Sequence, residues 1–477
     1  MERLEFPQTQ CQAAVTRVDI TPPVGIFHRM WGAARHDRAT GVHRPLLATL
    51  LWLQPANGAA DQALVTVTLD HCILDNPDIE RMQRAAAAAA GIEPRQVLVT
   101  LSHTHAAGLM SRSRSGDPGG DLIGPYLDQM TERVAQLARE ASQRLQAATV
   151  QYARGSASLA RHRDYWDEAR RQYVCGLHPD GPADDTLMVA RVVGEDGHCL
   201  GTVVNYACHP TTLAWDNTLI SPDYPGALRE LVEELTGAPC LFLLGAAGDL
   251  GPRDGFVGYP AVADRHGRQL GYAALSALES LPSPGQTLAY QGPVVSGTLI
   301  GAWDYEPLSA AAAEAARRWQ VDARPIDLPY RVDLPTCEET EVALRDWQRQ
   351  ETEAQAAGDA GLARDCRAMV EQMTRQLWRL QALHPGKAFH LPVTIAELGQ
   401  ALWVFVAGEH YQQLQCTLRE RFADRPVIVT TLTGGWQPGY IPTARTYGYG
   451  IYQEQIAVVA PGSLEVIQEE IVRRVAP

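Results

Sequence analysis

Short apolar runs that alternate with helical stretches are the feature that most constrains the fold of this chain. Pro225 lies near the first turn of one predicted helix, a position that favours helix initiation. The runs predict strands at Ala63–Leu69, Gln96–Leu101, Leu187–Val193, Gly201–Tyr206 and Cys240–Leu244, and helices at Pro77–Ala90, Leu122–Ala147 and Pro225–Thr236. This alternation predicts an α/β fold of layered mixed β-sheets with flanking helices, in which strand ends and loops present the polar residues.

A change of composition begins near Ala302, becomes pronounced at Thr336 and predicts an inserted helical hairpin over residues 333–388. Glu, Gln, Arg and Ala dominate there, with scattered apolar residues and a turn near Ala357–Gly361. A solvated or oligomerising arm is favoured over a catalytic lid, because charged helices are usually scaffolding. Later elements are predicted as strands at Leu391–Leu398, Leu402–Ala407 and Val427–Thr431 and a final helix at Gly462–Arg474. We expect one domain over residues 1–477, with the hairpin inserted in it.

Composition narrows the class of protein and its partners. An apolar fraction of 45% in 477 residues is enough for one large core or two ordinary ones. A net charge of −14 disfavours a nucleic-acid partner, because phosphate binding needs a positive field. Nine cysteines without a C-x-x-C pair predict free thiols in a reducing compartment. The segment Met1–Pro7 lacks the apolar core of a secretory signal, so a cytoplasmic location is expected.

Two histidines follow a predicted strand directly. The run Val97–Leu101 leads into Ser102, His103, Thr104 and His105. If the extended backbone continues, the two imidazoles point to the same side, because side chains two apart do so in a strand. One ring could then bind a metal ion while the other faces substrate. Capping of a loop by both rings is the alternative.

His209 and Glu409 also follow apolar runs that predict strands. His209 precedes Pro210, which favours an extended backbone, and Glu409 ends the run from Trp403. Taken alone, the histidine could be a buried hydrogen-bonding residue and the carboxylate a solvated one. Two imidazoles and a carboxylate are an ordinary ligand set for catalytic zinc, which lowers the pKa of a bound water to about 7. Such a set suits hydrolysis better than redox chemistry.

A glycine-rich segment, Leu244–Arg253, follows another predicted strand. Its glycines would allow backbone N–H groups to approach an oxyanion, and a plain tight turn is the equal alternative. Asp249 could orient a histidine or the attacking water, or bond only to its own backbone. The segment lacks the Lys and Ser/Thr of a phosphate-binding loop, which disfavours nucleotide binding.

Seven short segments in this order resemble the catalytic N-terminal region of the neutral, non-lysosomal ceramidase family. The likeness covers nearly the whole chain, and its specificity comes from the ordered set: Arg17–Pro23, Ser102–His105, Tyr206–Pro210, Leu219–Asp223, Gly248–Pro252, Ala407–Glu409 and Gly439–Thr443. The resemblance implies a zinc ion held by His103, His209, Glu409 and Tyr440. It also implies that His105 lies near the substrate and that an arginine in the segment Arg161–Asp164 contacts it; we choose Arg163, with a solvated surface arginine as the alternative. Tyr440 comes from the resemblance alone, since phenols are uncommon zinc ligands.

Two departures from the family pattern shape the expected function. Gly251 stands where the family carries a serine, so a serine acyl-enzyme route is not open from this position. We also expect the family's secretion signal and C-terminal β-sandwich to be missing, and no basic amphipathic helix indicates stable membrane association. A small soluble acyl or amide substrate is therefore expected rather than ceramide.

These observations predict a zinc-dependent hydrolase of a C–N amide bond that works by attack of metal-bound water. His105 would act as acid, base or oxyanion donor, with Arg163 and Asp249 as further catalytic candidates. Two alternatives stay open: a zinc-dependent esterase or lactonase, and a non-catalytic ligand-binding member of the family. A homo-oligomer is compatible with the helical arm.

Overall fold

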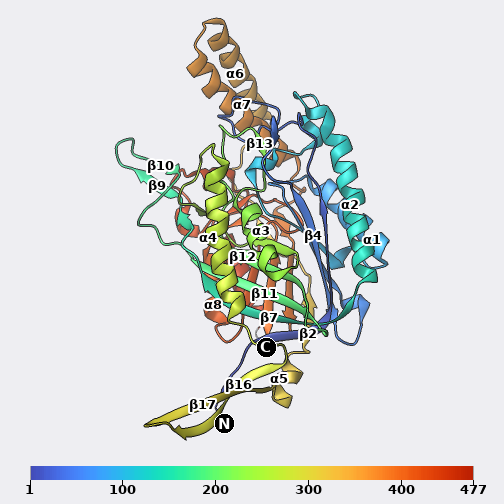
Figure 1. The fold of residues 1–477 in the computed structure, drawn as a ribbon. Coiled ribbons are helices and arrows are strands. Elements are labelled where there is room, and N and C mark those ends of the chain that lie inside the picture. The colour runs from blue at the N-terminus through green and yellow to red at the C-terminus, as the bar shows by residue number, and fades with distance from the viewer. Residues whose placement is uncertain (1, 476–477) are drawn as a thin grey trace.

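Two stacked β-sheets between layers of helices form the body of the chain (Figure 1). The computed structural model describes residues 2–475. The larger sheet has the strand order β14-β12-β11-β7-β2-β4-β5-β6, with β2 Gln8–Asp19, β4 Leu47–Pro55, β5 Leu64–Leu69, β6 Val97–Leu101, β7 Gln146–Ser156, β11 Thr186–Gly194, β12 Cys199–Tyr206 and β14 Cys240–Leu244. The smaller sheet has the order β18-β21-β22-β24, with β18 Trp319–Asp322, β21 Val393–Leu398, β22 Ala401–Val406 and β24 Val427–Thr430.

The two sheets face one another because both faces of their strands are apolar. In β22, Trp403 and Phe405 pack in the core between the sheets, whereas Leu402 and Val404 face the other way. In β12, Val203 faces the small sheet and Val204 faces the helices. Successive side chains of a strand point to opposite faces, so continuous apolar runs produce a sheet that is buried on both sides.

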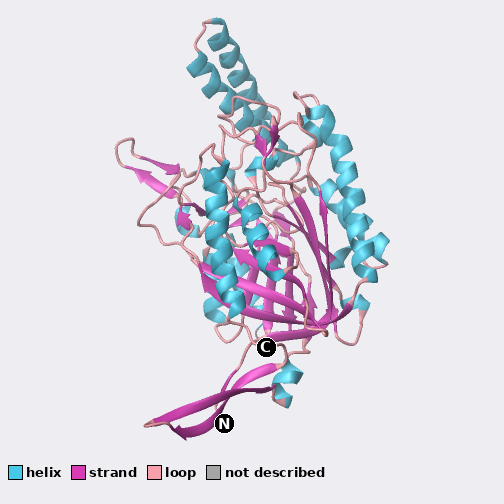
Figure 2. Ribbon diagram, viewed as in Figure 1, coloured by secondary structure: helices cyan, strands magenta, loops and turns pink. Residues whose placement is uncertain are grey.

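Helices cover the outer face of each sheet (Figures 1 and 2). The large sheet is covered by α1 Asn76–Ala90, α2 Ile123–Gln143, α3 Tyr224–Thr236 and α4 Pro260–Glu279. The small sheet is covered by α8 Gln413–Arg421 and α10 Ser463–Val475. Both sheets contain parallel and antiparallel pairs. The predicted α/β class, with layered mixed sheets and flanking helices, is confirmed.

Short elements complete the described fold and carry several of the site residues. They are β1 Arg3–Leu4, β3 Gly41–Val42, β8 Ala160–His162, β9 Asp164–Asp167, β10 Gln172–Cys175, β13 Leu219–Ile220, β15 Leu250–Pro252, β19 Ile326–Pro329, β20 Ala388–Leu391, β23 Glu409–His410, β25 Tyr440–Ile441, α5 Ala310–Ala315 and α9 Tyr452–Ile456. None of the helices among residues 2–475 is both long enough and apolar enough to cross a bilayer.

Two predicted elements differ from the structure by more than a shift of one or two residues at their ends. The helix predicted to reach Ala147 ends at Gln143, because the chain joins β2 and β11 as β7 from Gln146 onward. The strand predicted over Leu391–Leu398 is interrupted at Pro392, which has no N–H to donate, so β20 and β21 join different sheets. The change of composition near Ala302 marks no boundary, since β17 Leu299–Pro307 runs through it and pairs with β16 Gln286–Val295.

The inserted helical hairpin is present as α6 Cys337–Ala356 and α7 Ala360–Gln381, and it projects from the body at the top of Figure 1. Its second helix is anchored by buried polar contacts. Glu371 forms a two-pronged ion pair with Arg114, at 2.7 and 3.3 Å, and Arg375 Nη2 donates to the carbonyl oxygen of Met30 at 2.7 Å. The end of the hairpin around the turn between α6 and α7 is exposed, but the C-terminal half of α7, which ends at Gln381, is packed against the body.

Candidate metal centre

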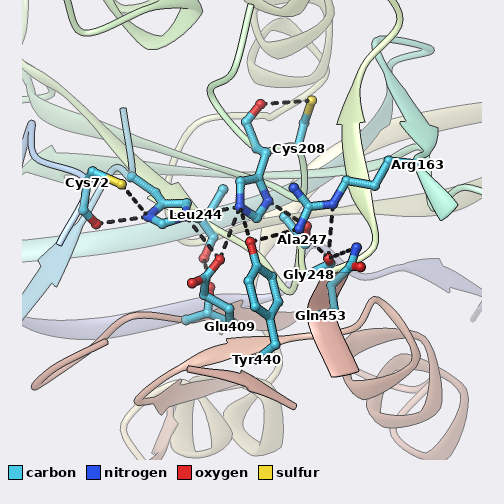
Figure 3. A network of polar contacts seen from close by, with 12 residues as sticks. Cys72, Arg163, Cys208, Leu244, Ala247, Gly248, Glu409, Tyr440 and Gln453 are labelled. Atoms are coloured by element: carbon cyan, nitrogen blue, oxygen red, sulfur yellow. Dashed lines mark hydrogen bonds and ion pairs between the residues drawn. The ribbon is translucent and has the colours of Figure 1, made fainter. Parts of the chain in front are cut away.

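Four residues predicted as metal ligands converge where strands of both sheets end (Figure 3). His103 Nε2 lies 3.0 Å from His209 Nε2, and each nitrogen lies 3.1 Å from Glu409 Oε2. The Tyr440 Oη atom lies 3.3 Å from His209 Nε2. All four side chains are buried or nearly so. The two imidazoles and the carboxylate form a group whose ligand atoms lie close enough together to hold one metal ion.

Hydrogen bonds at Nδ1 of His103 and of His209 determine that Nε2 of each ring faces the metal centre. His103 Nδ1 lies 2.8 Å from the carbonyl oxygen of Cys72, and His209 Nδ1 lies 2.7 Å from that of Ala247. A carbonyl oxygen can only accept, so each Nδ1 carries the hydrogen and each Nε2 of a neutral ring presents its lone pair to the centre. When both rings are neutral, two lone pairs and a carboxylate meet at hydrogen-bond distance without a donor between them. The donor set fits a divalent cation.

A second group of residues could also hold an ion and shares one histidine with the first. It consists of Cys72, His103 and His105. The Cys72 sulfur lies 3.5 Å from His103 Nδ1, but that nitrogen already donates to the Cys72 carbonyl. The inward-facing Nε2 is the free ligand atom of His103. The group with His209 and Glu409 is therefore the better candidate.

The His-x-His segment reaches the centre by a turn, not by an extended backbone. Strand β6 ends at Leu101, and His103 has a positive φ of 68°, which only a well-supported backbone maintains in a non-glycine residue. The support includes the hydrogen bond from His103 N to the carbonyl oxygen of His71, at 2.8 Å. His105 then opens a short 3₁₀ turn. The prediction that the two side chains share one side through continued extension is wrong, although both line the same cavity.

Glu409 and Tyr440 are brought together by a short parallel ladder. They are direct partners in the pairing of β23 with β25, and Glu409 N donates to the Gly439 carbonyl at 2.8 Å. Gly408 has a φ of 83°, and a Cβ there would lie 3.0 Å from the Gly439 oxygen. A glycine is needed at this position for the two segments to approach.

Arg163 lies in the same buried cluster, where it positions another side chain. Its Nη2 donates to Tyr440 Oη at 2.9 Å and to the Gly248 carbonyl at 2.6 Å, and its Nε donates to that carbonyl at 3.1 Å. Burial raises the pKa of the Tyr440 phenol well above its ordinary value, and the nearby guanidinium opposes that shift. Arg163 lines the cavity, as a residue that contacts substrate should, but these hydrogen bonds also make it a positioning residue for Tyr440.

His105 is the histidine that faces the cavity without a partner. Both of its ring nitrogens are buried and make no hydrogen bond within residues 2–475. Burial, and then the neighbouring His103 and His209, lower its pKa well below the ordinary value, so the ring is neutral. Trp31 packs against it with 4.9 Å between ring centroids. A neutral imidazole with both nitrogens free is suited to contact a substrate or a water molecule.

The glycine-rich segment contacts the candidate metal centre through its carbonyl groups and not, as predicted, through its N–H groups. Its carbonyl groups face the ligand cluster, through Ala247 and Gly248, whereas the Gly248 N–H donates to His410 O and the Gly245 N–H to Tyr206 O. The predicted oxyanion contact from these N–H groups is therefore wrong. A Cβ on Gly248 would lie 2.8 Å from the Glu409 carbonyl oxygen, so close packing explains this glycine.

Asp249 is the predicted catalytic residue that the structure does not bring to the cavity. Its carboxylate accepts hydrogen bonds from the backbone N–H and the side-chain Nε2 of Gln412, at 2.7 and 2.8 Å. The residue is buried, and it does not line the cavity beside the ligands. Asp249 therefore holds the start of α8 in place, and the histidine beside its carboxylate is His162, which is not one of the four candidate ligands and whose Nε2 lies 3.5 Å from Asp249 Oδ2.

A cavity of about 490 Å³ opens beside the four ligands. Its walls include several aromatic residues that sequence reasoning did not single out: Trp31, Trp215, Phe256, Trp378, Trp436 and Tyr452. The inner face of α7 contributes Arg375 and Arg379 as well as Trp378. The favoured interpretation of the hairpin as a solvated or oligomerising arm is therefore wrong for the C-terminal half of α7, which forms a wall of the cavity. A tryptophan within a charged helix was the signal in the sequence.

Comparison with known proteins identifies the fold. Neither a family model nor a curated protein sequence matches the chain. Among solved structures, neutral ceramidase from Pseudomonas aeruginosa aligns with a TM-score of 0.65 at 16% identity, over 98% of this chain and 74% of that one. A structure described as ceramidase complexed with C2 aligns with a TM-score of 0.62 at 15% identity, over the same shares of 98% and 74%. The chain thus has the fold of neutral ceramidase along nearly its whole length, as the sequence resemblance indicated.

Proposed function

We propose that this chain is a zinc-dependent hydrolase that cleaves a C–N amide bond in a small acyl compound. The observation that carries the proposal is the convergence of two imidazole lone pairs and a carboxylate at one buried point, beside a cavity. Imidazole and carboxylate ligands suit zinc, and an open side toward a cavity is typical of a catalytic site rather than a structural one. The amide bond is proposed because two ceramidase structures share the fold.

The metal ligands and His105 would have separate roles in the reaction. A zinc ion held by His103, His209, Glu409 and Tyr440 would supply a Lewis acid and lower the pKa of a water molecule to about 7. His105 is placed to accept a proton from the attacking water or to donate a hydrogen bond to the substrate carbonyl. Aromatic side chains in the cavity wall make the surroundings of these contacts less polar than water, which strengthens them.

The ligands come from both sheets, so we propose that they belong to one catalytic domain. His103 and His209 follow β6 and β12 of the large sheet, while Glu409 follows β22 of the small sheet. The single domain over residues 1–477, with the hairpin of residues 333–388 inserted in it, is part of this proposal. So are the small-molecule substrate and the cytoplasmic location.

The test combines metal analysis with paired substrates. The purified protein is analysed for metal, stripped with a chelator, reloaded with zinc, and assayed on amides and on esters with the same acyl group. We expect stripping to abolish amide hydrolysis and zinc to restore it. His103→Ala and Glu409→Ala should abolish it as well, whereas His198→Ala is a matched control because that imidazole is 82% exposed.

Each contrary result has a distinct meaning. Full activity in metal-free protein removes the mechanism. Hydrolysis of the esters alone would assign the chain as an esterase or lactonase, since the same centre can activate water for either bond. Tight zinc binding without turnover of any acyl compound would favour a ligand-binding protein.

A further inference from the structure

One cationic side chain in the cavity wall has no partner in the described structure. Arg379, in the last turn of α7, is 5% exposed and lines the cavity. Within residues 2–475 its guanidinium makes no hydrogen bond and no ion pair. Long cationic side chains are rarely buried unless they are paired, because removing a charge from water is costly.

The acidic groups nearby are already committed to other partners. Glu371 is held by Arg114 at 2.7 Å and by Arg367 at 3.2 Å. Glu409 belongs to the ligand cluster, where His103 and His209 lie 3.1 Å from its Oε2. No carboxylate of the cavity wall is therefore free to neutralise Arg379.

The other arginines of the wall also have partners. Arg375 donates to the Met30 carbonyl at 2.7 Å and lies 3.9 Å from Glu371. Arg163 donates to Gly248 and Tyr440. Arg379 is thus the one guanidinium lining the cavity, among residues 2–475, that makes neither a hydrogen bond nor an ion pair.

Arg379 lies close to the candidate metal centre. Its Cδ would be 4.0 Å from a Cβ on Gly439, the residue that precedes Tyr440. Burial lowers the pKa of Arg379, and the charges of Tyr452 and Glu409 act against that shift, which places both groups within electrostatic range. A molecule bound in the cavity beside the metal centre therefore shares the cavity with this guanidinium.

The rest of the cavity wall is suited to an apolar group. Trp378 precedes Arg379 on α7 and packs on Trp436, with 4.7 Å between ring centroids. Trp215 stacks on Phe256 with centroids 6.2 Å apart on another part of the wall. The cavity thus joins a planar cation, which binds carboxylates by paired hydrogen bonds, to aromatic surfaces that bind apolar groups.

We propose that Arg379 recognises a carboxylate and that the substrate is an anionic amide of the N-acyl amino acid class. This inference rests on the proposed amide hydrolysis and specifies its substrate. In the reaction a C–O bond forms between water and the acyl carbon, the C–N bond breaks, and a proton from the water goes to the departing amine. Arg379 takes no part in these bond changes; it holds the carboxylate of the amino-acid part.

Binding tests the proposal without any turnover. N-acetylphenylalanine and its neutral counterpart N-acetylphenylalaninamide are titrated into zinc-loaded and zinc-free protein, with tryptophan fluorescence as the signal, because several tryptophans line the cavity. We expect the carboxylate compound to bind about 10- to 100-fold more tightly, the range for a charged hydrogen-bonded pair. Arg379→Gln should remove that preference and Arg379→Lys should reduce it. Arg364→Gln is the matched control, since it removes a cation from an exposed position of the same helix.

Hydrolysis separates this proposal from the proposed function. Acetate release from the two compounds gives kcat/KM, and Arg379→Gln should lower it for the carboxylate compound alone. Equal binding of both compounds by the wild-type protein, or an unchanged preference in a folded Arg379→Gln protein, would overturn the anion site even if amides are hydrolysed. Preferential binding without acetate release would instead refute the proposed hydrolysis and keep the anion site.

Folding of the variant is checked by thermal unfolding. Arg379→Gln removes an uncompensated buried charge, so its Tm should be no lower than that of the wild type. If this variant is unfolded, the Arg379→Lys protein and the wild-type comparison of the two compounds decide the question.

Discussion

Arg163 Nη2 donates a hydrogen bond to Tyr440 Oη over 2.9 Å, and this contact fixes the phenol that faces the histidine ligands. The same guanidinium is held in turn by the Gly248 carbonyl. The positive charge of Arg163 beside the phenol oxygen favours the ionised phenolate, the form of a phenol that binds a metal. The strength of metal binding should therefore depend on an arginine that is not itself a ligand.

Arg163→Met should weaken zinc binding by about 10- to 100-fold, as is typical when a hydrogen-bond partner of a ligand is removed. Competition with a chromophoric chelator measures the affinity. Arg161→Met is the matched control, because Arg161 is only half-buried and bonds a local carbonyl. In a Tyr440→Phe background the Arg163 substitution should have little further effect. An unchanged zinc affinity in a folded Arg163→Met protein would contradict the positioning role.

Gly248→Ala and Gly251→Ala should differ sharply although they lie in one segment. A Cβ on Gly248 would lie 2.8 Å from the backbone oxygens of both Glu409 and His410, whereas one on Gly251 would meet nothing closer than 3.9 Å. Overpacking of this kind costs about 1 to 3 kcal/mol, so we expect that loss in the free energy of unfolding of Gly248→Ala. Gly251→Ala should be neutral or stabilising by up to about 1 kcal/mol. Urea denaturation measures both, and equal losses would show that the close approach at Gly248 is not limiting.

Acid should destabilise the fold through His28. Its ring is buried, Nε2 lies 2.9 Å from the Ala106 carbonyl, and Nδ1 lies 3.0 Å from His36 Nε2. Burial lowers the pKa of His28 from 6.5 to about 4, and the neighbouring His36 contributes to that shift. The unfolded chain thus binds a proton that the folded chain refuses between these values. Stability is full above pH 6.5 and falls by up to about 3 kcal/mol as the pH approaches 4.

Urea unfolding at pH 7, 6 and 5 measures the acid effect, and a His28→Gln protein should show a smaller loss over the same range. His198→Gln is the control, since its exposed ring has no reason to change the slope. A slope that His28→Gln leaves unchanged would mean that other groups account for the acid sensitivity.

Whether a site residue could be predicted from the sequence depends on the pattern around it. His103, His209 and Glu409 could be predicted because each follows an apolar run, and strand ends on two facing sheets converge. Tyr440 was found through resemblance alone, since nothing in its neighbourhood marks a phenol as a ligand. The turn at His103 escaped prediction because its positive φ depends on a contact with His71, far away in sequence.

Arg379 and Asp249 show the limit more plainly. From sequence alone, a charged helix is expected to be exposed to solvent. Only the packing of α7 against the body shows that Arg379 faces a cavity. Asp249 lies in a segment that does reach the centre, but its carboxylate turns to Gln412. Even where a loop is located correctly from the sequence, the direction in which one of its side chains points depends on tertiary contacts. Neither spacing nor composition predicts those contacts.

Anomalous scattering at the zinc edge, from crystals of the zinc-loaded protein, tests the central claim most directly. We predict one strong peak about 2.0 to 2.1 Å from both His103 Nε2 and His209 Nε2, with Glu409 and Tyr440 oxygens completing the coordination. A peak bounded instead by Cys72, His103 and His105, or no peak near these residues in protein that is fully active, would contradict it.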